Sequence, residues 1–480
     1  MQKTKKTKIV ATLGPAINNR ETLKELMISG VNVFRINFSH ADYDEVTKIV
    51  KIIRELNDEM GYHVACLADL QGPKLRVGVM AEGIVLAIKD EFTFTTEELA
   101  IGTREKAFMT YKNFPIDVKV GEHILVDDGK LLFEVVATDG VSNVRTKVLR
   151  GGPLKSKKGV NLPNTDISLP ALTVKDVEDA IFALSLEVDW MALSFVRNPE
   201  DLDAIHKLIA EHSDTSVYRT RVISKIEKPE ALENIDAIIA NTDAIMVARG
   251  DLGVEIPMAE VPLVQKMLVR KAKEAKIPVI IATQMMETMI DCQVPTRAEV
   301  NDVANSIMDG ADAVMLSGET SVGQFPNEVI QKMREIIVSV EHSPLIDVPR
   351  NAPVFSSTDR YLSEAVCYQA ASMADHIKAK AIVTLTYSGY TAFQISAFRP
   401  NCHIQVFSNN KRVLAMLNLY WGVKAKYYNE NLSTTKTIAA VNELVKERGV
   451  LESGDYVINL NSTPVKHEGM VNNLRVSKIM

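Results

Sequence analysis

The chain has 480 residues, of which 46% are hydrophobic and 24% charged, a balance typical of a globular protein with two to four domains. The net charge of −6 is mild and neither half is strongly basic, which argues against a nucleic-acid binder. Four scattered cysteines without CxxC spacing predict neither a zinc site nor a disulfide framework, and no apolar stretch is long enough for a membrane span. We therefore expect a cytoplasmic protein with no nucleic-acid or membrane partner.

Residues 8–318 contain eight short apolar runs, most of them followed by a segment with helical spacing. Such alternation predicts parallel strands, and strands buried on both faces are rich in Val, Ile, Ala and Leu throughout. We therefore predict a (β/α)₈ barrel, that is, a TIM barrel. The runs are Lys8–Gly14, Val31–His40, His63–Leu70, Trp190–Val196, Val222–Glu227, Ala244–Gly250, Pro278–Gln284 and Ala313–Gly318.

The sequence changes character between the third and fourth runs. Residues 74–170 carry short alternating segments with hairpin signals at Asp127-Asp128-Gly129 and Thr138-Asp139-Gly140, and almost no helical periodicity. We interpret this stretch as a small β-barrel inserted into a barrel loop, and call it the lid. The predicted catalytic barrel then comprises residues 1–73 and 171–343.

The C-terminal part follows a weakly patterned, Pro-containing linker at Ser343–Asp359. Strands and helices alternate again after it, so residues 344–480 are predicted to form an α/β domain with a doubly wound sheet. Its expected strands are Ala381–Thr386, Ile404–Ser408, Ala425–Tyr428 and Tyr456–Leu460.

Polar side chains end six of the eight predicted barrel strands. Catalytic groups of such barrels come from the C-terminal strand ends, so we expect the active site there. The strand-end residues are Arg35, Asn37, Ser39 and His40, then Asp69, then Lys225 and Glu227, then Arg249, Gly250 and Asp251, then Thr283 and Gln284, and finally Ser317 and Glu319.

Side-chain alternation places Lys225 and Glu227 on one face of their strand. They could form only a structural ion pair, but burying such a pair costs several kcal/mol, which favours a functional explanation. Glu227 and Asp251 are hard oxygen ligands suited to Mg²⁺, although Asp251 could instead cap a helix after Gly250. Together with Arg35, these residues point to phosphoryl transfer, which needs positive charge around the migrating group.

Other polar residues carry weaker signals. Thr283 could bind a carboxylate or pass a proton, or be only a strand-end hydroxyl, and His40 is better explained by hydrogen bonding or stacking than by catalysis. The basic turn at Leu154–Pro163 lies where a lid would reach the strand ends, so it could contact nucleotide phosphates. We find no Ser/His/Asp or Cys/His nucleophile signature and no P-loop.

Eight ordered motifs along nearly the whole chain resemble the pyruvate kinase family, whose domain plan matches the predicted one. The motifs are Thr7–Ala16, Arg35–His40, Ser156–Pro163, Ile223–Glu227, Met246–Pro257, Ala282–Met285, Pro295–Glu299 and Leu316–Thr320.

The resemblance implies the glycolytic transfer of a phosphoryl group from phosphoenolpyruvate to ADP, giving pyruvate and ATP. It implies that Glu227 and Asp251 hold one Mg²⁺, that a second Mg²⁺ arrives with ADP, and that Lys225 and Arg35 stabilise the migrating phosphoryl. It also implies a homotetramer. The remaining roles it assigns are substrate carboxylate binding by Gly250, Asp251 and Thr283, enolate protonation involving Thr283 through water and Ser317, and nucleotide contacts by Asn37, His40, Arg76 and Lys158.

One departure from the family concerns K⁺. Many members bind this ion with Asn, Ser, Asp and a following Thr, and carry a nearby Glu. This chain keeps Asn37, Ser39 and Asp69, but has Leu70 in place of the Thr and Lys74 in the acidic position. The pattern resembles the K⁺-independent branch, in which a tethered ammonium can supply the charge of the ion. We therefore predict activity without K⁺.

A possible effector loop lies at Thr386–Ala392, with Thr386, Ser388, Gly389 and Thr391 as candidate phosphate contacts. Tyr390 stands where a basic residue is common, and Ser462–Glu468 lacks the Trp and Arg of fructose-1,6-bisphosphate responders. A sugar monophosphate, a nucleotide or no effector all remain open.

Two rival interpretations deserve comparison. Another Mg²⁺ enzyme of phosphoenolpyruvate or pyruvate chemistry, such as an aldolase or lyase, would need no Lys beside the metal ligand and would lack the inserted β domain. A non-catalytic relative would have lost at least one of five key residues, yet all are present: Arg35, Lys225, Glu227, Asp251 and Thr283.

Overall fold

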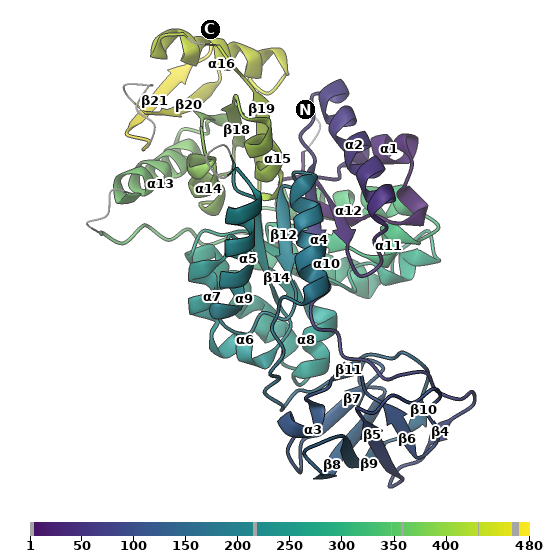
Figure 1. The fold of residues 1–480 in the computed structure, drawn as a ribbon. Coiled ribbons are helices and arrows are strands. Elements are labelled where there is room, and N and C mark those ends of the chain that lie inside the picture. The colour runs from purple at the N-terminus through teal and green to yellow at the C-terminus, as the bar shows by residue number, and fades with distance from the viewer. Residues whose placement is uncertain (1–3, 215–217, 347, 357–359, 431, 463–469) are drawn as a thin grey trace.

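The structure, a computed structural model, describes residues 4–214, 218–346, 348–356, 360–430, 432–462 and 470–480 (Figure 1). Eight parallel strands close into a barrel in the order β1-β16-β15-β14-β13-β12-β3-β2, which confirms the predicted (β/α)₈ fold. Each strand overlaps its predicted run. The strands are β1 (Lys8–Thr12), β2 (Val33–Asn37), β3 (Ala65–Asp69), β12 (Trp190–Leu193), β13 (Arg221–Ile226), β14 (Ala244–Ala248), β15 (Val279–Ala282) and β16 (Ala313–Leu316).

Helices surround the barrel, and some of them begin at a capping side chain. The side chain of Asn19 accepts a hydrogen bond from the first turn of its helix, and Thr173 and Thr296 each form a capping box with an acidic residue three positions later. These helical elements are η1 (Pro15–Ile17), α1 (Arg20–Ser29), α2 (Tyr43–Met60), α4 (Val174–Ser185), α5 (Glu200–His212), α6 (Pro229–Glu233), α7 (Ile235–Asn241), α8 (Arg249–Glu255), α9 (Val261–Glu274), η2 (Glu287–Ile290), α10 (Arg297–Asp309), α11 (Gly318–Ser321) and α12 (Pro326–Glu341).

The lid sequence forms β-structure, as predicted. A six-stranded sheet runs in the order β11-β7-β8-β9-β5-β6, with a small β10-β4 pair beside it. Four buried phenylalanines, including Phe94 and Phe133 with ring centroids 5.1 Å apart, fill its core. The elements are β4 (Val85–Leu86), β5 (Glu91–Thr95), β6 (Lys106–Phe108), α3 (Phe114–Asp117), β7 (His123–Val126), β8 (Leu131–Thr138), β9 (Asn143–Arg150), β10 (Gly152–Pro153) and β11 (Val160–Asn161).

The C-terminal sheet has the order β19-β18-β17-β20-β21 and contains all four predicted strands. One strand was not predicted: β21 pairs antiparallel with β20 at the sheet edge. Its residues are mostly exposed or half-buried, so they form no apolar run. The elements are α13 (Arg360–His376), β17 (Ala381–Leu385), α14 (Tyr390–Ala397), β18 (His403–Ser408), α15 (Lys411–Met416), η3 (Leu417–Leu419), β19 (Val423–Tyr427), α16 (Thr434–Glu447), β20 (Tyr456–Asn461) and β21 (Asn473–Lys478).

The C-terminal part closes one end of the barrel. Trp190, inside the barrel and fully buried, donates its indole N–H to the carbonyl of Met416 at 3.2 Å and lies 6.1 Å from the Tyr420 ring. The inward side chains of this barrel end therefore share one apolar cluster with the C-terminal sheet and its helices. The C-terminal ends of the strands lie at the other end of the barrel, and the predicted site residues lie there.

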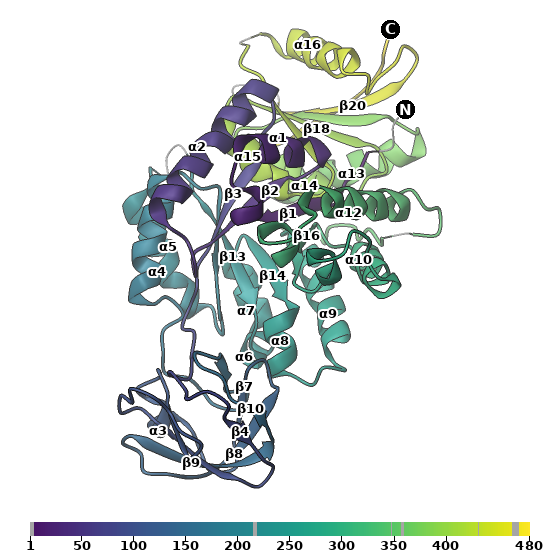
Figure 2. The same cartoon turned by 90° about the vertical axis from the view of Figure 1, so that its right-hand side faces the viewer.

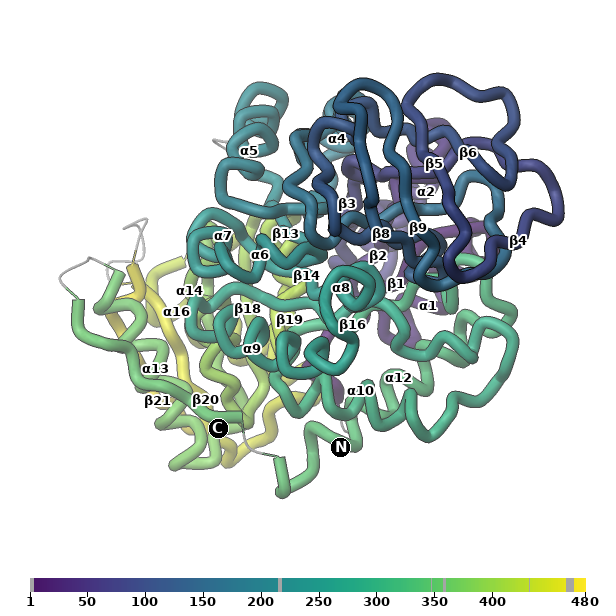
Figure 3. The backbone as a smooth tube through the Cα atoms, turned by 90° about the horizontal axis from the view of Figure 1, so that it is seen from below, coloured from purple at the N-terminus to yellow at the C-terminus, as the bar shows by residue number. Residues whose placement is uncertain are grey.

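The lid and the C-terminal sheet lie at opposite ends of the barrel, in two views at right angles (Figures 1 and 2). Seen from the lid end, the lid is displaced to one side of the barrel (Figure 3). Within the described part of the chain, no helix is both long and apolar enough to cross a membrane.

Candidate functional site

The C-terminal ends of β2, β3 and β13 bring Arg35, Asp69 and Lys225 together. Arg35 Nε donates to Asp69 Oδ2 at 2.7 Å, and Lys225 Nζ lies 3.4 Å from Asp69 Oδ1. Arg35 also donates through a terminal nitrogen to the Thr12 hydroxyl at 3.1 Å. The side chains of Arg35 and Lys225 are each 12% exposed, so both cations keep an opening towards the barrel mouth.

Lys225 is the most highly connected of these cations. Its Nζ lies 2.9 Å from Glu227 Oε1 and donates to the Ser194 hydroxyl at 2.7 Å. Burial acts to lower the pKa of Lys225, but the carboxylates of Asp69 and Glu227 outweigh it and raise the pKa well above its ordinary value. The side chain is therefore a permanent cation at neutral pH and cannot serve as a general base there.

Glu227, the partner of Lys225, is also held by a backbone hydrogen bond. Its carboxylate is 1% exposed, and Oε2 accepts the backbone N–H of Phe195 at 2.8 Å. Burial raises the pKa of Glu227, Lys225 opposes that rise, and the charge of Asp251 adds to it. The charge of Asp251 therefore acts on the buried Glu227 carboxylate.

This pair fits Mg²⁺. The carboxylate of Asp251 makes no hydrogen bond or ion pair to any residue that the structure describes, although it lies near the buried Glu227. Mg²⁺ is commonly held by one or two carboxylates while it keeps waters and substrate oxygens. Two carboxylates, one of them without a partner among the described residues, match this donor set.

Thr283 and Gly250 form the wall beside Asp251. The Gly250 N–H donates to the Thr283 hydroxyl at 2.8 Å, and that hydroxyl donates to the Ala282 carbonyl at 2.6 Å. Thr283 has a φ of 69°, a strained value for a β-branched residue and of the kind that gathers at functional sites. A Cβ at Gly250 would lie 3.3 Å from the Thr283 hydroxyl, so glycine permits this close approach.

Ser317 follows β16 on the neighbouring strand end. Its backbone N–H donates to Glu319 Oε2 at 2.7 Å, and Glu319 Oε1 accepts the Met286 N–H at 3.2 Å. Glu319 is 3% exposed, so this buried carboxylate ties together the loops after β15 and β16. The Ser317 hydroxyl makes no hydrogen bond to the described residues.

Some of the residues expected at the K⁺ site lie close together. Asn37 is the register partner of Asp69, and its side-chain oxygen accepts the Ser39 N–H at 3.2 Å. β2 ends at Asn37, so Ser39 lies in the following turn instead of continuing the strand. Leu70 is buried, whereas Lys74 is exposed and makes no ion pair with a described residue. Replacement of the ion by Lys74 therefore stays a prediction.

The expected nucleotide contacts come from the lid and from the loop after β2. Lys158 Nζ lies 2.9 Å from Asp127 Oδ1, and Arg76 donates to the Lys157 carbonyl at 3.1 Å. Arg76 and Gly159 also form a β-bridge, so the two basic residues belong to one edge of the lid. His40 is exposed in the barrel loop after Asn37.

The possible effector loop lies before α14. The Gly389 N–H donates to the Thr386 hydroxyl at 2.8 Å, and Gly389 has a φ of 90°. Thr391 is buried inside α14. The guanidinium of Arg360 lies over the Tyr390 ring, 5.1 Å from the ring centroid. The other expected effector segment, Ser462–Glu468, falls outside the described residues after Ser462, and Ser388 adds no side-chain hydrogen bond within them.

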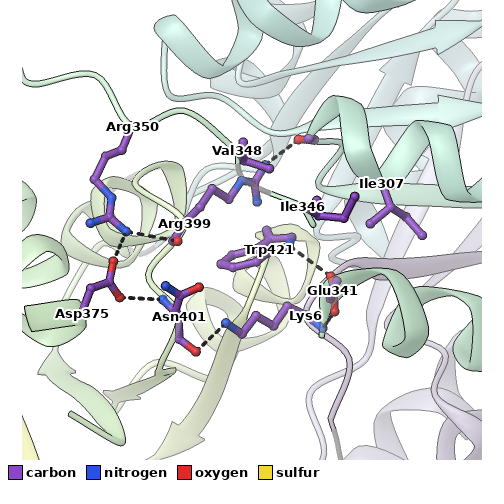
Figure 4. A pocket seen from close by; sticks show the side chains of 11 residues that line it. Lys6, Ile307, Glu341, Ile346, Val348, Arg350, Asp375, Arg399, Asn401 and Trp421 are labelled. Atoms are coloured by element: carbon purple, nitrogen blue, oxygen red, sulfur yellow. Dashed lines mark hydrogen bonds and ion pairs between the residues drawn. The ribbon is translucent and has the colours of Figure 1, made fainter. Parts of the chain in front are cut away.

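A cavity of about 280 Å³ lies between the barrel and the C-terminal part (Figure 4). The Trp421 indole separates the cations Lys6 and Arg399, each 4.8 Å from its ring centroid. Glu341 accepts the indole N–H at 3.2 Å. These paired groups join the barrel to the C-terminal part of the chain.

Sequence reasoning missed several residues that hold the site together. Thr12, Ser194 and the Phe195 N–H each contact a predicted site residue. Thr12 lies on β1, and Ser194 and Phe195 directly follow β12, so no local spacing links them to those residues. Arg249, noted only as a strand-end residue, donates to the Thr283 carbonyl at 2.7 Å and to Asp302 at 2.7 Å. Its position next to Gly250 was the one available signal.

Comparison with known proteins gives concordant matches. The family description "Pyruvate kinase, barrel domain" matches residues 4–330, and "Pyruvate kinase, alpha/beta domain" matches residues 364–477. A curated pyruvate kinase of Mycobacterium tuberculosis is 40% identical over 476 residues, 99% of each chain. One of Corynebacterium glutamicum is 40% identical over 472 residues, covering 98% of this chain and 97% of the relative. A solved pyruvate kinase of Cryptosporidium parvum has a TM-score of 0.91 at 34% identity, covering 99% of this chain and 96% of that chain.

Proposed function

The chain belongs to the pyruvate kinase family, and from that premise we propose that this kinase transfers the phosphoryl group of phosphoenolpyruvate to ADP, giving pyruvate and ATP. The observation that carries the proposal is the buried Lys225 ammonium, held between Asp69 and Glu227 at the open end of the barrel. The transferred group carries negative charge on three equatorial oxygens, and a fixed cation stabilises it without moving.

Each neighbouring side chain takes one part of the reaction. Arg35, oriented by Asp69 and Thr12, adds the second cation beside the phosphoryl group. The Gly250–Asp251 backbone and the Thr283 hydroxyl hold the substrate carboxylate, and Thr283 passes a proton to the enolate through water and Ser317. Lys225 is assigned to charge stabilisation, because Asp69 and Glu227 hold its ammonium in place.

Glu227 and Asp251 would hold Mg²⁺. When bound, the metal supplies positive charge to the phosphoryl and enolate oxygens. The Phe195 N–H orients the Glu227 carboxylate at 2.8 Å. A second Mg²⁺ is proposed to arrive with ADP, whose phosphates approach Lys158 and Arg76 of the lid, with Asn37 and His40 on the barrel side.

We further propose that the reaction needs no K⁺, because Leu70 removes a ligand of that ion and Lys74 brings a tethered cation. The proposed domains are residues 1–73 with 171–343 for catalysis, 74–170 for the lid and 344–480 for subunit contacts in a homotetramer. The loop of Thr386, Ser388, Gly389 and Thr391 is a candidate effector site for a sugar monophosphate or a nucleotide.

The test is a lactate-dehydrogenase-coupled assay of the purified protein. Pyruvate should form only when phosphoenolpyruvate, ADP and Mg²⁺ are all present. Pyruvate formation without ADP would instead support a lyase or phosphatase, and no turnover under any condition would support a non-catalytic relative.

A further inference from the structure

A buried ion pair where the lid meets the barrel has no part in the chemistry above. Lys228 follows Glu227 in the sequence, and its Nζ lies 2.8 Å from Glu255 Oε1. Their side chains are only 6% and 1% exposed. A buried pair is weak support for stability, since both charges must leave water, so its presence calls for a further reason.

The same carboxylate oxygen also binds the lid. Asn161 Nδ2 donates to Glu255 Oε1 at 2.8 Å, the same distance as Lys228. Asn161 is the last residue of β11 and is the register partner of Leu125 on β7, so it moves with the lid sheet. Glu255 Oε2 is buried without a hydrogen-bond partner. One oxygen therefore joins the lid to the barrel, while the other is buried without a partner among the described residues.

On the barrel side, Glu255 ends the helix that carries the proposed metal ligand. α8 runs from Arg249 to Glu255, and Asp251 lies one turn before Glu255. A cavity of about 60 Å³ is lined by both of these carboxylates, by Lys228 and by Asn161. A displacement of Glu255 is therefore expected to move Asp251 as well, because both residues belong to the same short helix.

On the lid side, Asn161 follows the proposed nucleotide contact Lys158 by three residues. Lys158 pairs with Asp127 at 2.9 Å in the turn between β7 and β8. A Cβ at Gly129 in that turn would lie 3.8 Å from Val254 Cγ1, so the turn itself lies against α8. The basic edge of the lid thus touches the metal-binding helix both at this turn and at Glu255.

We propose that Glu255 is a positioning residue that couples the lid to the metal site, by holding Asn161 and Lys228 on one oxygen and so fixing α8 and Asp251. The inference rests on the proposed function, since that function makes Asp251 a metal ligand. It assigns no contact with substrate to Glu255. Its consequence is that lid position and metal affinity depend on each other.

The first test is Asn161→Ala, which removes the lid side of the contact and leaves the buried ion pair intact. Binding of Mn²⁺ alone, followed by the electron paramagnetic resonance signal of the free ion, should weaken about three- to tenfold. Hydrogen exchange of residues 249–256 should become faster, although the substitution is in the lid. The Mg²⁺ concentration for half-maximal rate should rise by the same factor.

The matched control is Asn143→Ala. Asn143 also lies in the lid, but its side chain bonds Asp139 and Ser142 within a lid turn. Its Mn²⁺ affinity and the exchange of residues 249–256 should equal those of the unsubstituted protein. If Asn161→Ala behaves like this control, the coupling is refuted.

The second test replaces the pair by apolar residues in Lys228→Met/Glu255→Leu, which leaves no unpaired buried charge. Metal binding should weaken as in Asn161→Ala, and adding Asn161→Ala to this variant should change nothing further. Normal metal binding in the double variant would refute the proposal, as would a full second loss on adding Asn161→Ala. Should the double variant fail to melt cooperatively, the single variant and its control decide.

The two proposals fail separately. Absence of phosphoryl transfer in the unsubstituted protein would overturn the proposed function, and the Mn²⁺ and exchange measurements would still judge the coupling. Normal transfer together with an inert Asn161→Ala variant would overturn the coupling alone.

Discussion

Replacing Lys225 by Met removes the buried ammonium while keeping an unbranched side chain of similar length. At ~3 Å from a phosphoryl oxygen and an effective dielectric constant of about 20, one unit charge contributes about 5 kcal/mol. Part of this acts on bound substrate as well as on the transition state, so the differential effect is smaller. Removal of one preorganised donor elsewhere costs about 10²–10³ in kcat. We expect kcat to fall about a thousandfold.

The change in substrate binding should be much smaller. Arg35 and the Gly250–Thr283 wall remain, so the affinity for phosphoenolpyruvate, measured by calorimetry, should fall less than about tenfold. Steady-state kinetics by the coupled assay then separate kcat from KM. Near-normal turnover would remove Lys225 from the mechanism, and an equal loss in binding and kcat would make it a binding residue only.

Folding must be checked in the same variant. Lys225 offsets the charges of Asp69 and Glu227, whose side chains are 2% and 1% exposed, so its loss should also lower the melting temperature. Lys271→Met is the control, because Lys271 pairs with Asp236 at 2.5 Å between the outer helices α9 and α7. It should leave kcat unchanged, and the Lys225→Met rate is interpreted only below its own melting transition.

Four further outcomes follow from the same contacts. Asp251→Asn should raise the Mg²⁺ concentration for half-maximal rate at least about tenfold, by titration of the rate, because one of two anionic ligands becomes neutral. Exchange of Na⁺ for K⁺ should change kcat less than about twofold if Lys74 replaces the ion; a severalfold gain in K⁺ would contradict this. Loss of the Lys225 ammonium removes a charge that lowers the pKa of Glu227, so the acid limb of kcat/KM against pH should move to higher pH in Lys225→Met. Phe133→Ala should destabilise the lid by about 3–5 kcal/mol in a denaturant melt, and an unchanged transition would refute the packing account.

Much of the barrel could be predicted because its strands are buried on both faces and therefore read as continuous apolar runs. Polar residues near the C-terminal end of such a run are expected at the barrel mouth, which is why Asp69 and Lys225 could be proposed before the structure was known. The prediction was less good at strand ends. Ser39 was expected at the end of the strand predicted within Val31–His40, but β2 stops at Asn37 and the chain turns.

Contacts between distant strands could not be predicted from spacing. Thr12 supports Arg35 from the neighbouring strand β1, and Ser194 supports Lys225 from the turn after the neighbouring strand β12, because the strand order of the barrel brings them together. The left-handed backbone conformation at Thr283 could not be predicted from the sequence either, since β-branched residues rarely adopt it. The edge strand β21 was not predicted, because its exposed residues carry no apolar pattern.

Glu255 shows the same limit at the lid. Its place four residues after Asp251 was visible in the sequence, but its partners Asn161 and Lys228 lie in separate segments. Only the folded chain shows that a lid residue and a barrel lysine share one carboxylate oxygen. That is why the coupling emerged from the structure and not from the motif.

The most direct test of the account is ³¹P nuclear magnetic resonance of the unsubstituted protein with phosphoenolpyruvate, ADP and Mg²⁺ in K⁺-free buffer. The phosphoenolpyruvate signal should decline while the γ-phosphate signal of ATP grows in equal amount. Growth of inorganic phosphate in its place, or no change in any signal, would contradict phosphoryl transfer at this site.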